Sequence, residues 1–263
     1  MARNSLKNVI RLINRVSQEL PPEQEFLSDL KRSIEMRDAK SSRQPSRTYK
    51  PSSMNCIRQS YYQVSGVELQ RVGANYNLVA ICETGTDRHE RLQNAIADMK
   101  HNGIDCEYID VAKYVESRAL ANIEVVEKKG NETKLYHKKL NISFMCDGIL
   151  RYHGHYYILE IKTEGSNKFW NRKDVDVSHH KQATTYSMAL EIDEVLFVYV
   201  CRDTLDMKSF IFKVTDDMKT DIISYIETCD EYVKRHETPP IPENVEKKTC
   251  EYCSYAELCR MEG

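Results

Sequence analysis

Apolar residues recur every three or four positions in five stretches of the chain, and this spacing predicts α-helices. The predicted helices cover about 4–20, 23–37, 86–102, 175–191 and 217–235. Pro21 and Pro22 end the first of them, and Thr86 or Asp87 caps the third. Elsewhere, alternating or continuous apolar runs predict β-strands: a strand–turn–strand at 146–163 and single strands at 194–202 and 209–215.

The order of these elements predicts an α/β or α+β fold in which helices flank a mixed central sheet. Residues 41–53, SSRQPSRTYKPSS, are rich in Ser, Pro and basic residues, which predicts a linker. Residues 1–52 are therefore predicted to form an N-terminal helical arm with its linker, and residues 53–263 the main domain. Packing of the arm on the main domain is the alternative. Residues 238–259 are predicted to be a loop that ends in cysteines.

The stretch CDGILRYHGHYYILEIKT carries charged residues where an apolar interior is expected. Because side chains alternate between the faces of a strand, Glu160 and Lys162 share one face, and a turn at RYHGH brings Asp147 beside Glu160. Carboxylates held this close repel each other unless a divalent cation lies between them, and oxygen ligands favour Mg²⁺ or Mn²⁺. With Lys162 nearby, such a site suits phosphodiester hydrolysis. An ordinary hairpin with a solvated Glu–Lys pair is the alternative.

Two predicted helices place polar side chains among inward-facing apolar ones. His89 follows the same helical spacing as Leu92 and Ile96. In the helix predicted at 175–191, His179, Gln182 and Tyr186 share one face. A structural core histidine and a polar rim on an amphipathic helix are the alternatives to functional roles.

In their order along the chain, Gly85-x-x-x-His89, Asp147, Glu160-Ile161-Lys162 and Gln182-x-x-x-Tyr186 resemble the motifs of the RecB-like branch of the PD-(D/E)XK nuclease superfamily. The resemblance covers about residues 54–260 and implies a restriction-endonuclease-like core. It implies that Mg²⁺ or Mn²⁺ is bound by His89, Asp147, Glu160 and the backbone carbonyl of Ile161. It also implies that Lys162 is the catalytic lysine, and that Gln182 and Tyr186 orient the active site and the DNA backbone.

Three cysteines lie close together near the C-terminus, as Cys250-x2-Cys253-x5-Cys259. Grouped cysteines in an intracellular chain favour a metal or iron–sulfur site over disulfides, and such a site needs a fourth ligand. Cys56, in MNCIRQSYY, resembles the first cysteine segment of iron–sulfur RecB-like nucleases, which include the AddB nuclease domain and the CRISPR-associated adaptation nucleases. That resemblance implies a structural [4Fe–4S] cluster on all four cysteines. Zn²⁺ on the same thiolates is the alternative.

The other five cysteines occur singly and are predicted to be buried small apolar residues: Cys82, Cys106, Cys146, Cys201 and Cys229.

The segment KFWNRKDVDVSHH, residues 168–180, mixes aromatic and basic residues directly after the predicted catalytic strand. Lys168, Arg172 and Lys173 are candidates for contacts with DNA phosphates, and Phe169 or Trp170 for stacking on a base. A loop anchored in the core, with solvated charges, is the alternative.

Composition adds limits on partners and location. A net charge of −2 excludes a uniformly basic nucleic-acid binder, although residues 1–60 hold twelve Lys and Arg against six Asp and Glu. Solvated helical faces explain that excess equally well. No apolar run approaches the roughly 20 residues that span a bilayer, and the first residues lack the apolar block of a secretory signal. We therefore expect a cytoplasmic protein of a bacterial or phage-infected cell, with no membrane partner.

Together these features predict a Mg²⁺- or Mn²⁺-dependent DNA exonuclease acting on single-stranded or duplex ends. By analogy with its relatives, we expect a role in DNA recombination, repair or replication, in a bacterium or a phage. The sequence contains no GxxxxGK[ST] motif, so we expect no helicase motor in it, and a recombination or helicase partner is left open. The alternatives are a structure-specific endonuclease, an RNA-directed enzyme, and a DNA-binding module with an inactive nuclease site.

Overall fold

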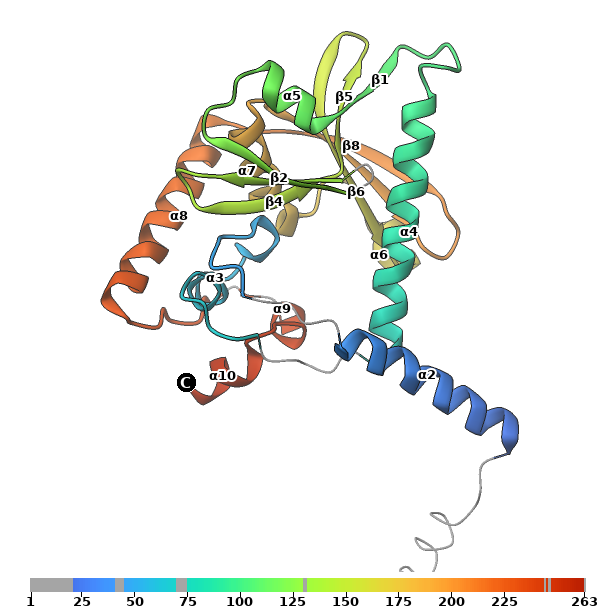
Figure 1. The fold of residues 1–263 in the computed structure, drawn as a ribbon, viewed down its shortest axis with the longest axis vertical. Helices are drawn as coiled ribbons and strands as arrows, with labels where there is room; N and C mark the ends of the chain where they lie inside the picture. The colour runs from blue at the N-terminus through green and yellow to red at the C-terminus, as the bar shows by residue number, and fades with distance from the viewer. Residues whose placement is uncertain are drawn as a thin grey trace, which may run out of the picture. The chain divides into compact units, whose positions relative to one another are not determined.

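A five-stranded sheet with both parallel and antiparallel neighbours forms the centre of the larger of two compact units (Figure 1). The computed structural model describes residues 21–40, 45–69, 75–129, 132–243, 245 and 247–262. The smaller unit comprises Met1–Ser42 and Gly73–Ile81, and the larger comprises Arg43–Val72 and Cys82–Gly263. Every predicted site residue belongs to the larger unit.

The central sheet has the strand order β1-β5-β6-β7-β8. Only β6 and β7 run parallel, and the other neighbours are antiparallel. Its strands are β1 (Cys106–Ile109), β5 (Gly148–Tyr152), β6 (His155–Glu164), β7 (Glu194–Cys201) and β8 (Met207–Lys213). A second, antiparallel sheet contains β2 (Ile123–Lys129), β3 (Glu132–His137) and β4 (Ile142–Cys146). The predicted mixed α/β fold, with helices flanking a mixed central sheet, is confirmed.

The helices vary widely in length. The longer ones are α2 (Pro22–Lys40), α3 (Ile57–Val64), α4 (Tyr76–Asp98), α7 (His180–Leu190) and α8 (Asp216–Arg235). The shorter ones are η1 (Pro51–Ser53), α5 (Val111–Ser117), α6 (Ser166–Asn171), η2 (Val177–His179), α9 (Lys247–Glu251) and α10 (Ala256–Met261). Within the described residues, no helix is both long and apolar enough to span a membrane.

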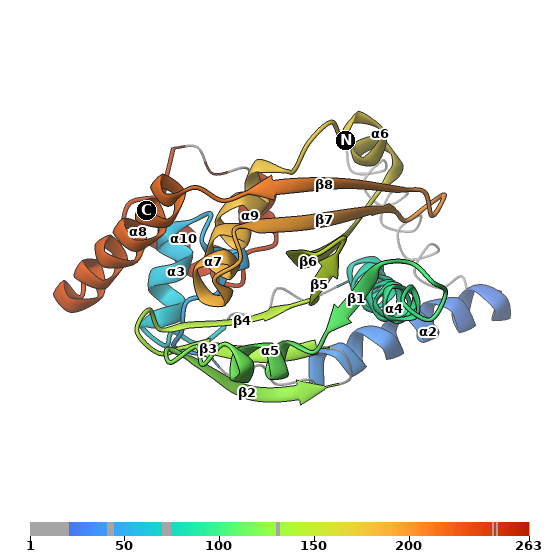
Figure 2. The same cartoon turned by 90° about the horizontal axis from the view of Figure 1, so that it is seen from above.

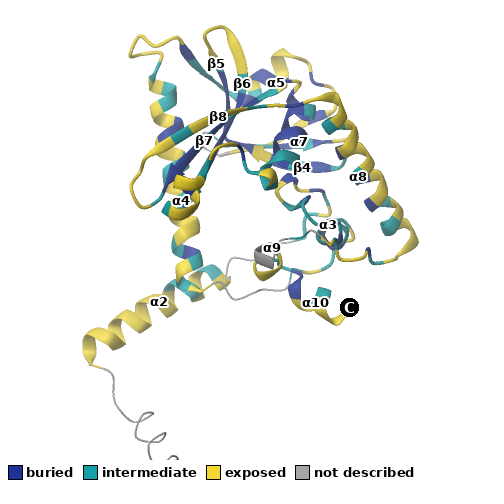
Figure 3. Cartoon of the chain, turned by 180° about the vertical axis from the view of Figure 1, so that it is seen from behind, coloured by how far each residue is buried: buried dark blue, intermediate teal, exposed yellow. Residues whose placement is uncertain are grey.

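The two faces of β6 are buried against different clusters of apolar residues. Ile158 belongs to the larger cluster, whereas Leu159 and Ile161 pack with Leu92 of α4 in the smaller one. Figure 3 shows buried residues along β6 and β7, whereas no residue of β8 is buried. The alternation predicted for residues 156–162 is therefore confirmed, and a strand covered on both faces can hold Glu160 away from water.

Helix α7 packs between the two sheets (Figure 2). Its Tyr186 ring stacks on Phe144 of β4, with centroids 5.1 Å apart, and the Tyr186 hydroxyl donates to the Met145 carbonyl at 2.7 Å. The helix ends where Glu191 adopts a left-handed conformation, with φ 54°. These contacts fix the helix that carries two predicted site residues.

Side-chain capping and charged residues define the two ends of helix α8. The Thr215 side chain caps its start by accepting from Met218 N, and two aspartates fill the first turn. Lys234 and Arg235 lie in the last turn, where their positive charges interact favourably with the negative end of the helix dipole. The prediction of a helix at 217–235 is confirmed to within one residue.

Several predicted boundaries differ from the structure. Helix α4 begins ten residues before Thr86, whose hydroxyl donates to the Cys82 carbonyl inside the helix instead of capping it. Tyr49, in the predicted linker, is fully buried and pairs with Ile142 as an isolated bridge. The predicted C-terminal loop contains α9 and α10. The predicted helix 23–37 is confirmed by α2, while the predicted helix 4–20 lies outside the described residues.

Candidate active site and cysteine cluster

A tight hairpin between β5 and β6 brings the two predicted metal-binding carboxylates together. His153 and Gly154 form its two-residue turn with φ values of 47° and 81°, the combination that matches the twist of a hairpin. The register pairs Gly148 with Leu159, so Asp147 lies beside Glu160 on the neighbouring strand. The predicted neighbourhood of Asp147 and Glu160 is confirmed.

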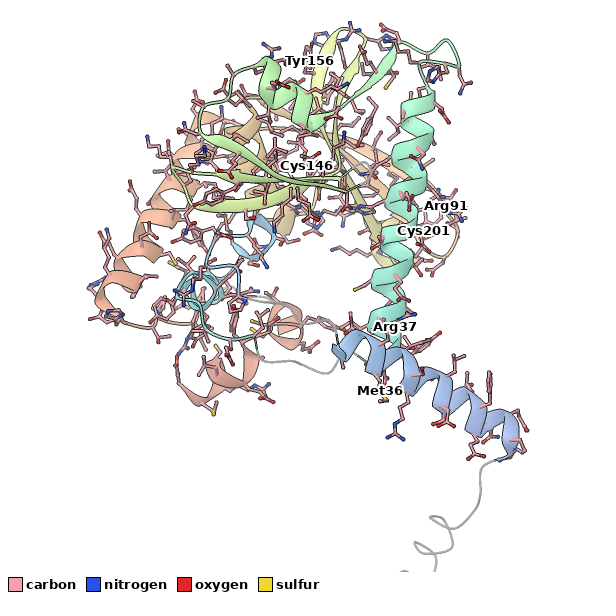
Figure 4. The ribbon with its side chains drawn as sticks, viewed as in Figure 1. Met36, Arg37, Arg91, Cys146, Tyr156 and Cys201 are labelled. Atoms are coloured by element: carbon pink, nitrogen blue, oxygen red, sulfur yellow. The ribbon has the colours of Figure 1, made fainter. Side chains whose placement is uncertain are left out.

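Asp147 lies at the bend where the chain passes from β4 into β5, and four groups hold it. Its carboxylate pairs with His89 Nδ1 at 3.1 Å and accepts from the Ile161 backbone N–H at 2.6 Å. Its backbone carbonyl accepts from Gln93 Nε2 at 2.8 Å and from the Tyr108 hydroxyl at 2.6 Å. The preceding residue, Cys146, is buried in the interior (Figure 4). Asp147 is therefore fixed through both its side chain and its main chain.

Gly148 allows Tyr108 to approach Asp147. A Cβ atom at Gly148 would lie 2.6 Å from Tyr108 Cε2 and 2.7 Å from its hydroxyl oxygen. We expect Gly148→Ala to lower the free energy of unfolding by about 1–3 kcal/mol, because either the ring or the bend must move. Urea unfolding of the variant against the wild type measures this difference.

The Tyr108→Ala background provides the control for that prediction, since it removes the clashing ring. There, adding Gly148→Ala should change stability much less than it does in the wild type. Equal losses in the two backgrounds would contradict the steric explanation.

Glu160 is the centre of a second, buried hydrogen-bonded group. It is 4% exposed, and its carboxylate contacts Lys162 Nζ at 2.5 Å and accepts from Gln182 Nε2 at 2.9 Å. Lys162 Nζ donates to Gln182 Oε1 at 3.0 Å, so the amide bridges both charged groups. Gln182 Nε2 also donates to the Tyr186 hydroxyl at 2.8 Å. The structure thus brings four predicted site residues from β6 and α7 into contact.

Burial and neighbouring charge shift the proton affinities in this site. Burial raises the pKa of Glu160 to about 7; the negative charge of Asp147 adds to that rise, whereas the ammonium group of Lys162 opposes it. Burial by itself would lower the pKa of His89, but the hydrogen bond to Asp147 and the negative charges of Asp147 and Glu160 together outweigh burial, so the pKa is raised. A positive charge placed between the carboxylates would be strongly stabilised.

The side chains present fit a hard divalent cation by donor type, since two carboxylates, an imidazole and the Ile161 carbonyl are available. Within the part of the chain that the structure describes, however, no group of three or more His, Cys, Asp or Glu side chains is arranged to hold a metal ion. Each carboxylate is satisfied by the protein instead: Asp147 by His89 and Ile161 N–H, and Glu160 by Lys162 and Gln182.

The four predicted cluster cysteines lie within electrostatic range of one another. Burial raises the pKa of Cys56, and negative charge on Cys259 and Cys250 raises it further. Burial likewise raises the pKa of Cys253, with contributions from the other three thiols. As the structure describes them, however, these thiols do not form a group of three or more side chains arranged to hold a metal ion, so a shared metal at the four cysteines stays a prediction.

Side-chain contacts hold the two cysteine segments together. The Tyr62 hydroxyl of α3 donates to the Glu262 carboxylate at 2.5 Å, and its ring lies 5.4 Å from that of Tyr255. Arg58, 5% exposed, donates to the Tyr62 hydroxyl at 3.1 Å and contacts Glu262. Cys56 is the N-cap residue of α3 and makes no side-chain cap hydrogen bond.

The remaining cysteines follow the prediction with one exception. Cys106, Cys146, Cys201 and Cys229 are buried, as predicted for small apolar residues, whereas Cys82 is exposed on α4.

The predicted DNA-binding residues divide into two kinds. Trp170 is 57% exposed on α6 and Lys173 is exposed after it. Lys168 pairs with Asp176 at 2.6 Å. For Trp170, Lys168 and Lys173, contact with DNA stays a prediction.

Arg172 has a structural role in place of the predicted phosphate contact. Its side chain is 5% exposed, donates to both Glu164 oxygens at 2.7 Å and to Asp176 at 3.0 Å, and lies 4.0 Å from the centre of the Tyr199 ring. A guanidinium group occupied on both edges and on one face has no surface left for a phosphate.

The ion pairs of Asp176 with Lys168 and Arg172 strongly lower the pKa of its carboxyl group. Burial would raise its pKa, but hydrogen bonds from Lys168, Ser178 and Arg172 outweigh burial and hold the pKa well below its usual range. Such a group stabilises the folded protein above its unfolded pKa of about 3.9, and that stabilisation is lost as the pH falls toward the folded pKa.

We therefore expect Asp176→Asn to destabilise the protein by about 2–3 kcal/mol at pH 7, because Arg172 and Lys168 lose a charged partner. The difference from the wild type should shrink as the pH falls below about 4. Urea unfolding across this pH range measures it, with the exposed Asp87→Asn as the matched control. A difference independent of pH would contradict the assignment.

Sequence reasoning missed two residues that position Asp147. Gln93 is 2% exposed and lies four positions after His89, so the helical spacing that selected His89 also contained Gln93. Tyr108 reaches Asp147 from β1, and its position depends on the pairing of β1 with β5, for which the chain carries no local signal.

Comparison with known proteins gives structural likenesses only. No family model matches the chain, and no curated protein matches it. The crystal structure of SSO0001 has a TM-score of 0.45 at 18% identity, covering 92% of this chain and 98% of that one. The alkaline exonuclease LHK-Exo from Laribacter hongkongensis has a TM-score of 0.43 at 11% identity, covering 73% and 90%. Its complex with dAMP has a TM-score of 0.43 at 13% identity. At these values, function has to be argued from the chain's own residues.

Proposed function

We propose that this protein is a Mg²⁺- or Mn²⁺-dependent DNA exonuclease, with residues 53–263 as its nuclease domain. The observation that carries the proposal is the meeting of Asp147, Glu160 and Lys162 on adjoining strands. Both carboxylates are buried, and a lysine contacts one of them at 2.5 Å. Buried like charges destabilise a fold, so their convergence favours a chemical role.

The protein's own residues supply the positioning that phosphodiester hydrolysis needs. Hydrolysis joins a water oxygen to phosphorus and releases one sugar oxygen, while negative charge grows on the non-bridging oxygens. The Lys162 ammonium balances that charge or holds the attacking water. Gln182 accepts from Lys162 Nζ and so sets its direction, and Tyr186 anchors Gln182 to the Met145 carbonyl.

The cation would be held by Asp147, Glu160, His89 and the Ile161 carbonyl. Binding would exchange the Glu160–Lys162 and Asp147–His89 pairs for contacts with the ion, which leaves Lys162 free to face the substrate. When bound, Mg²⁺ or Mn²⁺ polarises the phosphoryl oxygen and lowers the pKa of the attacking water. Burial, which raises the pKa of Glu160, supports this assignment, because a bound cation would offset the cost of holding this carboxylate away from water.

At the cysteines we propose a structural [4Fe–4S] cluster held by Cys56, Cys250, Cys253 and Cys259. Its support is the proximity of the four thiols and the contacts between α3 and the C-terminal residues. Four thiolates bind Zn²⁺ equally well, so the metal is decided by spectroscopy. Protein purified without oxygen should absorb in the visible range if it holds the cluster, because Zn²⁺ gives no such absorbance.

The proposed activity is tested with end-labelled linear DNA, closed circular single-stranded DNA and RNA. We expect release of nucleotides from linear DNA with Mg²⁺ or Mn²⁺, no cleavage in EDTA, and resistance of the circular DNA. Cleavage of the circles would indicate an endonuclease, and preference for RNA would change the substrate class. Binding without cleavage of any substrate would overturn the proposal of an enzyme. Roles in DNA recombination, repair or replication follow from an exonuclease activity.

A further inference from the structure

His179, the last residue of η2, lies beside the proposed catalytic lysine although no motif selects it. Its ring stacks against Phe197, with centroids 6.0 Å apart and an interplanar angle of 11°, and against Tyr199 at 5.9 Å and 23°. In the parallel register of β6 and β7, Glu160 is opposite Phe197 and Lys162 is opposite Tyr199. The imidazole therefore covers the same face of the sheet from which Glu160 and Lys162 project.

Hydrogen bonding determines which ring nitrogen of His179 carries a proton. The Tyr199 hydroxyl oxygen accepts from the Asp176 backbone N–H at 3.2 Å and lies 2.9 Å from His179 Nδ1. Since Nδ1 is the one acceptor that the described residues offer to the Tyr199 hydroxyl hydrogen, we assign that hydrogen to the bond with Nδ1. A neutral imidazole that accepts at Nδ1 carries its proton at Nε2.

The surroundings of His179 keep the ring neutral. Burial lowers its pKa to about 3, and the positive charges of Lys162, Lys168 and Arg172 act in the same direction, while Asp176 opposes them. At neutral pH the side chain is a hydrogen-bond donor without charge.

The Nε2–H group of His179 has no acceptor among the residues that the structure describes. Within the described part of the chain, His179 hydrogen bonds only through Nδ1, and Nε2 is not among the buried polar atoms that lack a partner. Since the residue is partly exposed, Nε2 is accessible on the face of the sheet from which Lys162 projects, within electrostatic range of its ammonium group.

The segment that carries His179 is held in place from two sides. The Asp176 carboxylate accepts from Ser178 N at 3.0 Å and from its hydroxyl at 2.6 Å. Asn55 donates to the Ser178 carbonyl at 2.8 Å. A donor whose direction is fixed before the ligand arrives loses little entropy on binding.

We propose that His179 Nε2–H binds a non-bridging phosphate oxygen of the DNA strand next to Lys162, as an uncharged donor. This inference rests on the proposed nuclease function. The position of His179 near the Lys162 ammonium group suits a phosphate, which carries one negative charge and several acceptor oxygens. An uncharged donor adds affinity without adding a counterion-releasing contact.

Two substitutions distinguish the effect of the Nε2–H donor from the effect of the aromatic ring of His179. His179→Phe keeps an aromatic ring against Phe197 and Tyr199 but removes Nε2–H, while His179→Gln restores an N–H donor near the same place. We expect His179→Phe to lower kcat/KM on labelled single-stranded DNA about tenfold, mainly through KM, and His179→Gln to recover part of it. Thermal unfolding of each variant shows whether it is folded.

Salt dependence distinguishes this contact from an ionic one. Measured from roughly 50 to 200 mM KCl, the slope of log(kcat/KM) against log[salt] should be the same for His179→Phe and the wild type. A slope reduced by about 0.7 would mean a charged contact and overturn the proposal. Unchanged kcat/KM in a folded His179→Phe, or no recovery in His179→Gln, would overturn it as well. If the wild type cleaves no DNA, the proposed function fails and this inference with it, whereas cleavage with an unaffected His179→Phe removes the inference alone.

Discussion

Lys162→Met should lower kcat for DNA cleavage roughly 10³-fold, the size of effect seen when a group that stabilises transition-state charge is removed. Methionine keeps the unbranched side chain but removes the ammonium group that lies 2.5 Å from Glu160 and donates to Gln182 at 3.0 Å. Single-turnover cleavage of end-labelled DNA with Mn²⁺ measures the chemical step separately from product release.

The Lys162→Met substitution should slow the chemical step of cleavage without weakening DNA binding. The exposed Lys139→Met provides the matched control, because it removes the same charge in the turn between β3 and β4, away from the proposed site. Lys162→Met should still bind DNA, and Lys139→Met should cleave at the wild-type rate. Wild-type cleavage by a folded Lys162→Met would remove Lys162 from the mechanism and the hairpin from the proposed active site.

Cys56→Ser should release the metal group and strongly destabilise the larger unit. A metal shared by Cys56 and Cys250 would join two positions that are 250 − 56 = 194 apart along the chain. Closing a loop of that length stabilises the folded state by about 5 kcal/mol in the chain-entropy model. We expect the variant to lose its visible absorbance and bound metal together, and to unfold at a lower temperature than the wild type.

Cys82→Ser is the matched control, since Cys82 is exposed on α4 and lies outside the four-cysteine set. It should keep the metal content and the unfolding temperature of the wild type. A Cys56→Ser protein with full metal content and unchanged stability would show that Cys56 is not a ligand.

The hairpin was predictable because its signals are local. Alternation along residues 156–162 assigned each side chain to a face, and the turn at His153 and Gly154 fixed the register that places Asp147 beside Glu160. The helical spacing around Gln182 and Tyr186 is local in the same sense, and the structure joins both residues to Glu160 and Lys162 through short hydrogen bonds.

Features that depend on tertiary contacts could not be predicted in this way. Arg172 belongs to a segment whose mixture of aromatic and basic residues is typical of DNA-binding surfaces. Its burial, however, depends on Glu164 and Asp176 facing it in the folded protein. Tyr49 looks like part of a polar linker, yet its hydroxyl donates to Asp230 of α8 at 2.6 Å. Tyr49 and Asp230 are 181 positions apart, so no local pattern contains both. Glu164 and Asp176 lie within eight positions of Arg172, but only the fold turns them toward it.

His179 is a similar case from the same segment. Its spacing relative to Gln182 indicates a shared helix face, which fits both amphipathic packing and a functional role. Only the stacking on Phe197 and Tyr199 and the single occupied ring nitrogen separate those two interpretations.

Binding of Mn²⁺ tests the central claim most directly, because the claim is that Asp147 and Glu160 share one cation. Electron paramagnetic resonance of free Mn²⁺ during a titration gives the number of tightly bound ions, without reference to catalysis. The account predicts tight binding to the wild type that is lost in both Asp147→Asn and Glu160→Gln and retained in Asp87→Asn. Equal binding by the wild type and the two site variants, or no binding by a folded wild type, would contradict it.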